Sequence, residues 1–172
     1  MKSFYAFTIM QSSEIPEVQR YTKKSFPAYA HRPGSTPHPK KAGGHSESLA
    51  DPVSEVITIH NWHEHQDYLY GADLFNHAFY WEAHVWWEAV WKSLPKGDIK
   101  DFVQGLIKVA AGSLKESMGE SDLAKMHCLR GHELMSKAYE QLENDCFFGV
   151  SRKWWNNIPF EIPTMLELHF DQ

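Results

Sequence analysis

The amino-acid sequence predicts an all-α protein, a compact antiparallel helical bundle with a long Pro/Gly-rich N-terminal loop and an aromatic C-terminal tail. Four stretches repeat apolar residues with the period of an α-helix. Short connections join these stretches, which makes successive helices antiparallel neighbours. Only one short β-branched run, residues 53–59, is suited to a strand, and no second run is available to pair with it.

The four predicted helices span residues 61–76, 79–92, 99–117 and 121–143. Asn76 stands where a left-handed residue would end the first helix, because Asn tolerates that conformation. The sequence from Pro95 to Asp98 ends the second helix and caps the third, and Ser121 is the expected N-cap of the fourth.

Helical wheels give the third and fourth helices one apolar face each. Gly131 lies within the apolar face of the fourth helix, where a small residue lets another helix approach closely. The apolar residues of the two faces are Phe102, Val103, Leu106, Ile107, Val109 and Ala110, and then Leu123, Ala124, Leu134, Met135, Ala138 and Leu142.

Three segments before the helices are less regular. Residues 15–21 are expected to make a short helix with Ser12 or Ser13 as its N-cap. Residues 27–52 contain five prolines and three glycines and are predicted to be a long loop, either disordered or functional. Residues 53–59 suit a strand, an extended coil or a helix start equally.

Length and composition predict one folded domain. The chain has 172 residues, of which 42% are hydrophobic and 23% charged, typical of a globular protein. Within this domain we expect the loop at 27–52, the helical core at 61–143 and the tail at 144–172. No stretch reaches the roughly 20 apolar residues of a membrane helix, and the opening residues lack a convincing secretory signal, so we expect a cytoplasmic protein without a membrane partner.

Charge and cysteine content exclude further classes of protein. The formal net charge is −5, with no cluster of Lys and Arg, so we expect no nucleic-acid partner. Eleven histidines make the charge sensitive to acid, and their full protonation would reverse its sign. The two cysteines, Cys128 and Cys146, have no CxxC spacing and predict neither a disulfide scaffold nor a cysteine zinc site.

The second predicted helix carries the candidate catalytic pair. It holds four of the seven tryptophans, and His84 and Glu88 lie one turn apart beside them. An imidazole and a carboxylate at this spacing can form a hydrogen bond and present the second ring nitrogen to a ligand, a proton or a metal. On the wheel, Glu82 and Trp86 point the other way, and Trp81 and Trp86 are expected to pack against the loop or the tail.

Two functions follow from this pair. In the first, it belongs to a site for a small ligand or a divalent transition metal, with metal-activated hydrolysis as the natural chemistry. Its metal ligands would be His38, His45, His84 and Glu88, and its other ligand-binding residues Asn76, Tyr80, Glu82 and Gln104. In the alternative, the polar network around His84 and Glu88 only fixes the register of the helices. The protein is then an interaction or scaffold module that contacts partners or further copies of itself through Trp154 and Trp155.

A family resemblance is carried by DLFNHAFYWEAH at residues 73–84, by Trp87, Glu88 and Trp91, and by QGLIKVAA at 104–111. These residues resemble the domain of unknown function 309 family. RPGSTPHP at 32–39 and GHS at 44–46 resemble a longer-loop branch of that family, so the resemblance covers about residues 32–142. It implies a small all-helical fold and no established activity.

The sequence departs from the family pattern at three positions. Ala78 stands where the family has Gly, Val85 where it has a second Glu, and Lys108 where it has a second Gln. The turn after Asn76 must therefore form without the residue that reaches positive φ most easily. The lost carboxylate also weakens a two-metal interpretation, since a bridged pair of cations needs several carboxylates.

Other catalytic signatures are absent from the sequence. There is no GxSxG motif. Ser46 follows His45, but chance alone would give such a pair, so no catalytic triad is predicted. Neither GxxxxGK[ST] nor GxGxxG occurs, which excludes the common phosphate-binding loops. The sequence therefore leaves open whether the protein is an enzyme.

Overall fold

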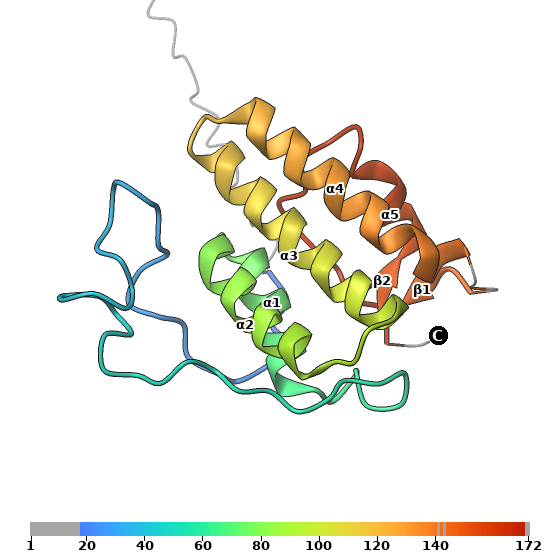
Figure 1. Ribbon diagram of the computed structural model, residues 1–172, viewed down its shortest axis with the longest axis horizontal. Coiled ribbons are helices and arrows are strands. Elements are labelled where there is room, and N and C mark those ends of the chain that lie inside the picture. Colours follow the sequence, from blue (N-terminus) through green and yellow to red (C-terminus); the bar gives the residue numbers. More distant parts are fainter. Residues whose placement is uncertain (1–17, 141, 143, 171–172) are drawn as a thin grey trace, which may run out of the picture.

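The computed structural model describes residues 18–140, 142 and 144–170 and is mostly helical, as predicted (Figure 1). The predicted helix at 15–21 falls partly outside these residues, and its described part, residues 18–21, is not helical. Along the chain the elements are α1 (Gln66–Asn76), α2 (Tyr80–Ser93), α3 (Asp98–Ser117), α4 (Ser121–Glu140), β1 (Cys146–Phe147), β2 (Val150–Ser151) and α5 (Arg152–Asn157).

Helix α1 begins five residues later than the sequence predicted. Asn61 is held in a turn, where its Oδ1 accepts from the Thr58 N–H at 2.7 Å and its Nδ2 donates to the Val56 carbonyl at 3.1 Å. Such side-chain bonds offer the backbone an alternative to helix. His65 becomes the N-cap, and its Nδ1 accepts from the Tyr68 N–H at 3.2 Å. Residues 53–57 form neither a helix nor a strand in the structure, and they have no strand partner within the described part of the chain.

The turn between α1 and α2 is a Schellman motif with an alanine at the left-handed position. The Phe79 N–H donates to the Leu74 carbonyl at 2.9 Å, and the Ala78 N–H donates to the Phe75 carbonyl at 3.1 Å. Ala78 has φ 62°, where a side chain is disfavoured. The prediction that Asn76 takes this conformation was wrong, because Asn76 is the last helical residue of α1.

Helices α3 and α4 lie side by side along most of their length (Figure 1). Two glycines allow the close approach, because a Cβ on Gly131 would lie 2.8 Å from the Gly105 carbonyl oxygen. This confirms the small-residue role predicted for Gly131. Met135 and Leu106 are fully buried, whereas Leu123, predicted to be buried, is 41% exposed on the outer side of α4.

The segment before the loop is bound to α1 by one buried carboxylate. Asp73 accepts from the backbone N–H of Tyr21 at 2.7 Å and of Thr22 at 2.9 Å, and from the Thr22 hydroxyl at 2.7 Å. The Arg20 Nε lies 3.2 Å from the same side chain. These contacts satisfy a charge that would otherwise be costly to bury, and they fix the start of the loop beside α1.

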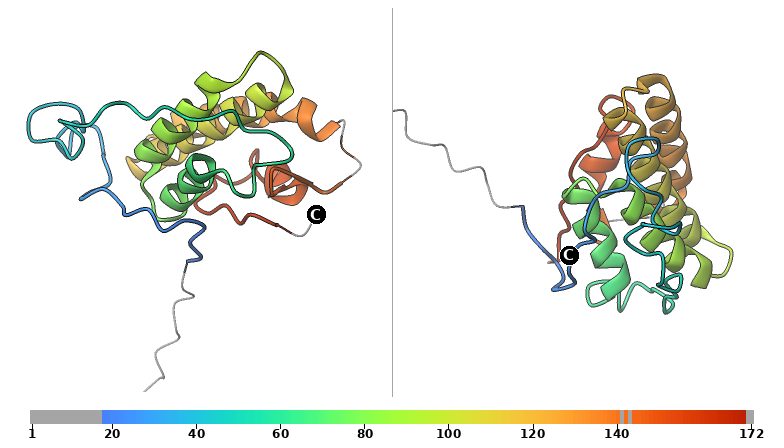
Figure 2. Two further views of the ribbon diagram at one scale, coloured as in Figure 1. Left: turned by 90° about the horizontal axis from the view of Figure 1, so that it is seen from below. Right: turned by 90° about the vertical axis from the view of Figure 1, so that its left-hand side faces the viewer.

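The C-terminal tail is part of the core. Figure 2 shows it, in red, running back along the helices. The Asn76 amide exchanges two hydrogen bonds with the backbone of Leu166, at 2.6 and 2.8 Å, and Leu166 is fully buried. Trp155 stacks on His132 and Tyr139 with ring centroids 4.4 and 4.8 Å apart. The tail therefore completes the packing of the bundle.

We expect Ala78→Gly to stabilise the protein. The substitution removes a Cβ from a left-handed residue, a cost of roughly 1–2 kcal/mol that the greater freedom of Gly in the unfolded chain partly offsets. The net gain in the free energy of unfolding should be about 1 kcal/mol, measured by urea unfolding. Ala111→Gly, inside α3, should change stability by about the same amount in the opposite direction. Equal signs for the two variants would contradict the prediction.

Gly131→Ala should destabilise the protein by about 1–3 kcal/mol, because the new methyl group meets the backbone of α3 rather than a flexible side chain. Thermal unfolding followed by circular dichroism at 222 nm measures the effect. Lys125→Ala, at an exposed position of the same helix, is the control and should change stability by less than about 0.5 kcal/mol. A Gly131→Ala variant as stable as this control would show that the helices can separate at no cost.

Candidate functional site

Glu82, in the first turn of α2, is the carboxylate around which the site is built. Its side chain is 3% exposed. Oε1 accepts from the backbone N–H of His31 at 2.9 Å and pairs with His45 Nε2 at 2.8 Å. Oε2 is buried and has no hydrogen-bond partner within the part of the chain that the structure describes. The acid therefore holds the loop with one oxygen and leaves the other unused.

The 27–52 loop folds back on itself before it reaches α2 (Figure 1, blue to cyan). The Tyr29 hydroxyl donates to the Pro37 carbonyl at 2.9 Å and accepts from the His45 N–H at 3.2 Å. A Cβ on Gly44 would collide with the carbonyl oxygens of His38 and Pro39, so only glycine fits there. These contacts set the position of His45, whose side chain is 5% exposed.

Two more loop histidines surround Trp81 on α2. The rings of His31 and His38 lie edge-on to the indole, with centroids 5.1 and 5.7 Å away. His31 Nδ1 also lies 2.9 Å from the Thr36 hydroxyl. Burial lowers the pKa of His31, and the nearby Glu82 carboxylate opposes this shift only in part. The prediction that Trp81 packs against the loop is confirmed.

Ser46 joins His45 and Glu82 in a continuous hydrogen-bonded chain. The Ser46 hydroxyl lies 2.7 Å from His45 Nδ1, on the opposite side of the ring from Glu82. An ionised carboxylate can only accept, so in the neutral imidazole the hydrogen bond to Glu82 places the proton on Nε2 and leaves Nδ1 to accept from the Ser46 O–H. The arrangement is a hydroxyl, an imidazole and a carboxylate in sequence, with the ring held in one tautomer.

A cavity of about 220 Å³ lies between the loop and α2. Ser46, His45 and Glu82 line it on its polar side, and most of its remaining wall is apolar. The apolar wall includes Trp81, Trp86, Leu49 and Pro52. Ligand sites typically combine an apolar wall with a few convergent polar groups.

The predicted catalytic pair lies outside this cavity. His84 Nε2 is 3.9 Å from Glu88 Oε2, and the two side chains are 34% and 36% exposed. Glu88 also pairs with Lys92 at 3.1 Å. Partial burial lowers the pKa of His84, with Glu88 acting in the opposite direction. We expected this pair to be the buried one, but on α2 the acid that faces inward is Glu82.

The four predicted metal ligands do not come together. His45 turns to Glu82 and His38 to Trp81, while His84 remains with Glu88. Among the residues that the structure describes, no group of three or more His, Cys, Asp or Glu side chains is arranged to hold a metal ion. What the loop brings to α2 is a hydrogen-bonded relay instead.

The other predicted ligand-binding residues have separate surroundings. Asn76 is engaged by the backbone of Leu166. Tyr80 is buried, with its ring edge-on to Phe75 at 5.2 Å. Gln104 lines a different recess, together with Trp91 and Lys137. Of the four residues, only Glu82 belongs to the cavity.

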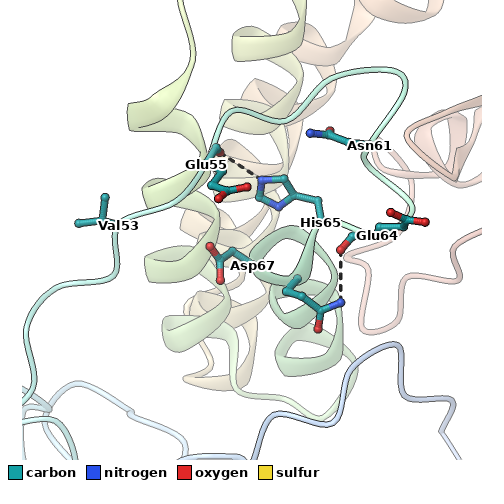
Figure 3. Close-up of a pocket in the computed structure, with 7 residues that line it drawn as sticks. Val53, Glu55, Asn61, Glu64, His65 and Asp67 are labelled. Carbon is teal, nitrogen blue, oxygen red and sulfur yellow. Dashed lines mark hydrogen bonds between the residues drawn. The ribbon is translucent and has the colours of Figure 1, made fainter.

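Figure 3 shows a larger and more open recess, of about 520 Å³, at the start of α1. His65 donates from Nε2 to the Glu55 carbonyl at 3.1 Å and caps α1 through its Nδ1, so both ring nitrogens are in use. Asp67 pairs with Lys24 at 2.6 Å. This recess has local partners for its buried polar atoms, so it is a weaker candidate than the cavity at Glu82.

Sequence reasoning missed His31, dismissed the pairing of Ser46 with His45 as one that chance would give, and gave Glu82 a subordinate role. A signal was present, because the wheel placed Glu82 on the side of α2 opposite His84 together with Trp86. No local pattern, however, indicates which of the eleven histidines meets that acid. His45 is 37 residues away along the chain, and the path of the loop decides the pairing.

A family model described as Domain of unknown function (DUF309) matches residues 68–126. Over these residues the chain is similar to the DUF309 family. This segment contains α2 and α3 in full and most of α1, so Glu82 is a residue of the DUF309 segment, whereas His45 and Ser46 precede it. Comparisons with curated proteins and with solved structures gave no match. No helix in the described ranges has the length and apolar character needed to cross a membrane.

Acid should destabilise the fold. Burial is the largest cause lowering the pKa of four histidines, His31, His84, His127 and His132, so their neutral forms are favoured in the folded protein. The unfolded chain, with imidazole pKa values near 6.5, then binds protons first as the pH falls. The free energy of unfolding should therefore decrease between about pH 7.5 and pH 5.5.

Urea unfolding at the two pH values measures this decrease. His84→Gln should make the pH dependence less steep, because it removes one of the four groups. His60→Gln, at an exposed residue, is the control and should leave the slope unchanged. Equal or greater stability at the lower pH would contradict the prediction.

Proposed function

We propose that this protein binds a small organic molecule in the cavity between the loop and α2, with Glu82 as the principal hydrogen-bond acceptor. The observation that carries the proposal is the buried Oε2 of Glu82, which has no partner within the described ranges. A buried polar atom left unpaired costs about 1–3 kcal/mol, and more when it is charged. Such atoms are rare in native structures and call for a ligand, an ion or a water molecule.

The neighbours of Glu82 indicate which ligand chemistry fits. A carboxylate oxygen needs a donor, so the ligand carries an N–H or O–H group, most favourably on a cationic nitrogen. Trp81, Trp86 and Leu49 line the cavity and provide apolar contact for the rest of the molecule. The volume of about 220 Å³ suits a compact ligand. We therefore propose a small amine or related donor with an apolar body.

A purely structural role for Glu82 explains less. Glu82 holds the loop through Oε1 alone, which already binds both His31 and His45. The tail that would carry a scaffold function packs against α4, where the Trp155 Nε1 donates to the His132 carbonyl at 3.0 Å. Neither holding the loop nor packing the tail explains why Oε2 of Glu82 is buried without a partner in the described part of the chain.

Benzylamine is a suitable probe, with benzyl alcohol as the uncharged molecule of similar shape. Titration followed by NMR of the tryptophan indole N–H groups should give saturable shifts with benzylamine and weaker binding of the alcohol. Glu82→Gln should weaken benzylamine binding at least about tenfold, since it removes the charged acceptor. Glu88→Gln, the half-exposed acid on the same helix, is the control and should bind as the wild type does.

Two outcomes would contradict the proposal. One is a wild-type protein that shows no saturable shift with benzylamine. The other is equal weakening by both variants, which would place the amine outside the cavity. Circular dichroism of each variant establishes that the fold is retained.

A further inference from the structure

We propose that Ser46 is a nucleophile that attacks small esters bound in the same cavity. This inference rests on the proposed function, because it takes the cavity as the substrate site. Its basis is the relay in which Ser46 Oγ, His45 and Glu82 are linked by contacts of 2.7 and 2.8 Å. A nucleophile, a base within hydrogen-bond reach and a third group that orients the base are the signature of covalent catalysis by serine.

Burial makes this relay more than a surface contact. The side chains of His45 and Glu82 are 5% and 3% exposed, so water does not screen the attraction between an imidazolium and this carboxylate. Ser46 is only half-buried, and it lines the cavity together with both partners. The base is thus sheltered while the hydroxyl group borders the space that a substrate would enter.

The tautomer gives each atom one role. His45 Nδ1 has no proton of its own, because Nε2–H is directed at Glu82, so Nδ1 is free to take the proton of Ser46. The Glu82 carboxylate stabilises the imidazolium that forms. Ring orientation is reversed relative to the common serine hydrolase arrangement, because Ser46 follows His45 directly in the chain and reaches the nearer nitrogen.

The reaction then balances without a cofactor. Ser46 Oγ forms a bond to the ester carbonyl carbon while its proton passes to His45 Nδ1. The bond from that carbon to the alcohol oxygen breaks, and the leaving alcohol takes the proton from Nδ1. Water next attacks the acyl group on Ser46, gives one proton to Nδ1, and releases the carboxylic acid as that proton returns to Ser46 Oγ.

Lys40 is suited to stabilise the negative charge that develops on the carbonyl oxygen. It is the cationic side chain among the residues that line the cavity. Its Nζ is held by the Leu49 carbonyl at 2.7 Å and by Asp51 at 2.8 Å. Asp51 is largely exposed, so water screens this pair and Asp51 neutralises the ammonium only in part.

The first experiment is covalent labelling of the full-length protein with a small alkyl fluorophosphonate. The reagent forms a bond from Ser46 Oγ to phosphorus and releases fluoride, while the hydroxyl proton leaves through His45. Mass spectrometry should locate one adduct on Ser46. Ser46→Ala should abolish it, and Ser48→Ala, at an exposed residue of the same loop, should label as the wild type does.

The second experiment separates the relay from a merely accessible hydroxyl group. His45→Gln and Glu82→Gln should each slow labelling of Ser46, by about a hundredfold for the base. Hydrolysis of 4-nitrophenyl acetate should be lost in parallel, and saturating benzylamine should protect the wild type from both reactions. Circular dichroism again establishes that each variant is folded.

The outcomes distinguish this inference from the proposed function. If benzylamine binds the wild type but no adduct forms on Ser46, the nucleophile assignment is overturned and the ligand site stands. An adduct that persists in Ser46→Ala, or that forms at the same rate in His45→Gln, also overturns it. If benzylamine does not bind and Ser46 is still labelled, the relay stands and the proposed ligand class is wrong.

Discussion

Glu82 places a carboxylate inside the protein at the point where the loop meets the helices, and the rest of the site depends on how that charge is satisfied. Burying an ionised group is unfavourable by several kcal/mol unless hydrogen bonds replace water. The His31 N–H and the His45 ring provide these bonds at 2.9 and 2.8 Å. A proline-rich segment that forms no helix or strand is thereby held in one place beside α2.

The same bonds explain how the loop provides two of the three chemical groups of the site, the base and the hydroxyl group. The core of the bundle is filled by packed apolar side chains such as Leu106 and Met135. Within the described residues, the buried atoms that lack a partner are few, and Glu82 Oε2 is the carboxylate among them. A loop with its own internal turns can present His45 and Ser46 to this acid without disturbing the helices. The matched family segment contributes the acid, and the chain before it contributes the base and the hydroxyl group.

Two buried acids together fix the position of the loop. Asp73 on α1 binds the backbone at Tyr21 and Thr22, just before the loop, and Glu82 on α2 binds it at His31. The chain is thus fixed beside α1 just before the loop, and the loop itself is fixed to Glu82 of α2 at His31 and His45, so it has little freedom to leave the helices. That constraint holds the loop residues that line the cavity in place.

The sequence by itself determined the helical class, the approximate positions of four helices and the close approach at Gly131. These features arise from local periodicity and residue size, which can be read directly from the sequence. It also placed Glu82 and Trp86 on one side of α2. Only the tertiary structure decided that Glu82, rather than Glu88, is the buried acid, that His45 is its partner, and that Ser46 completes the relay. The pairing of Glu82 with His45 joins residues far apart in the chain, and the path of a loop without periodic pattern fixes it.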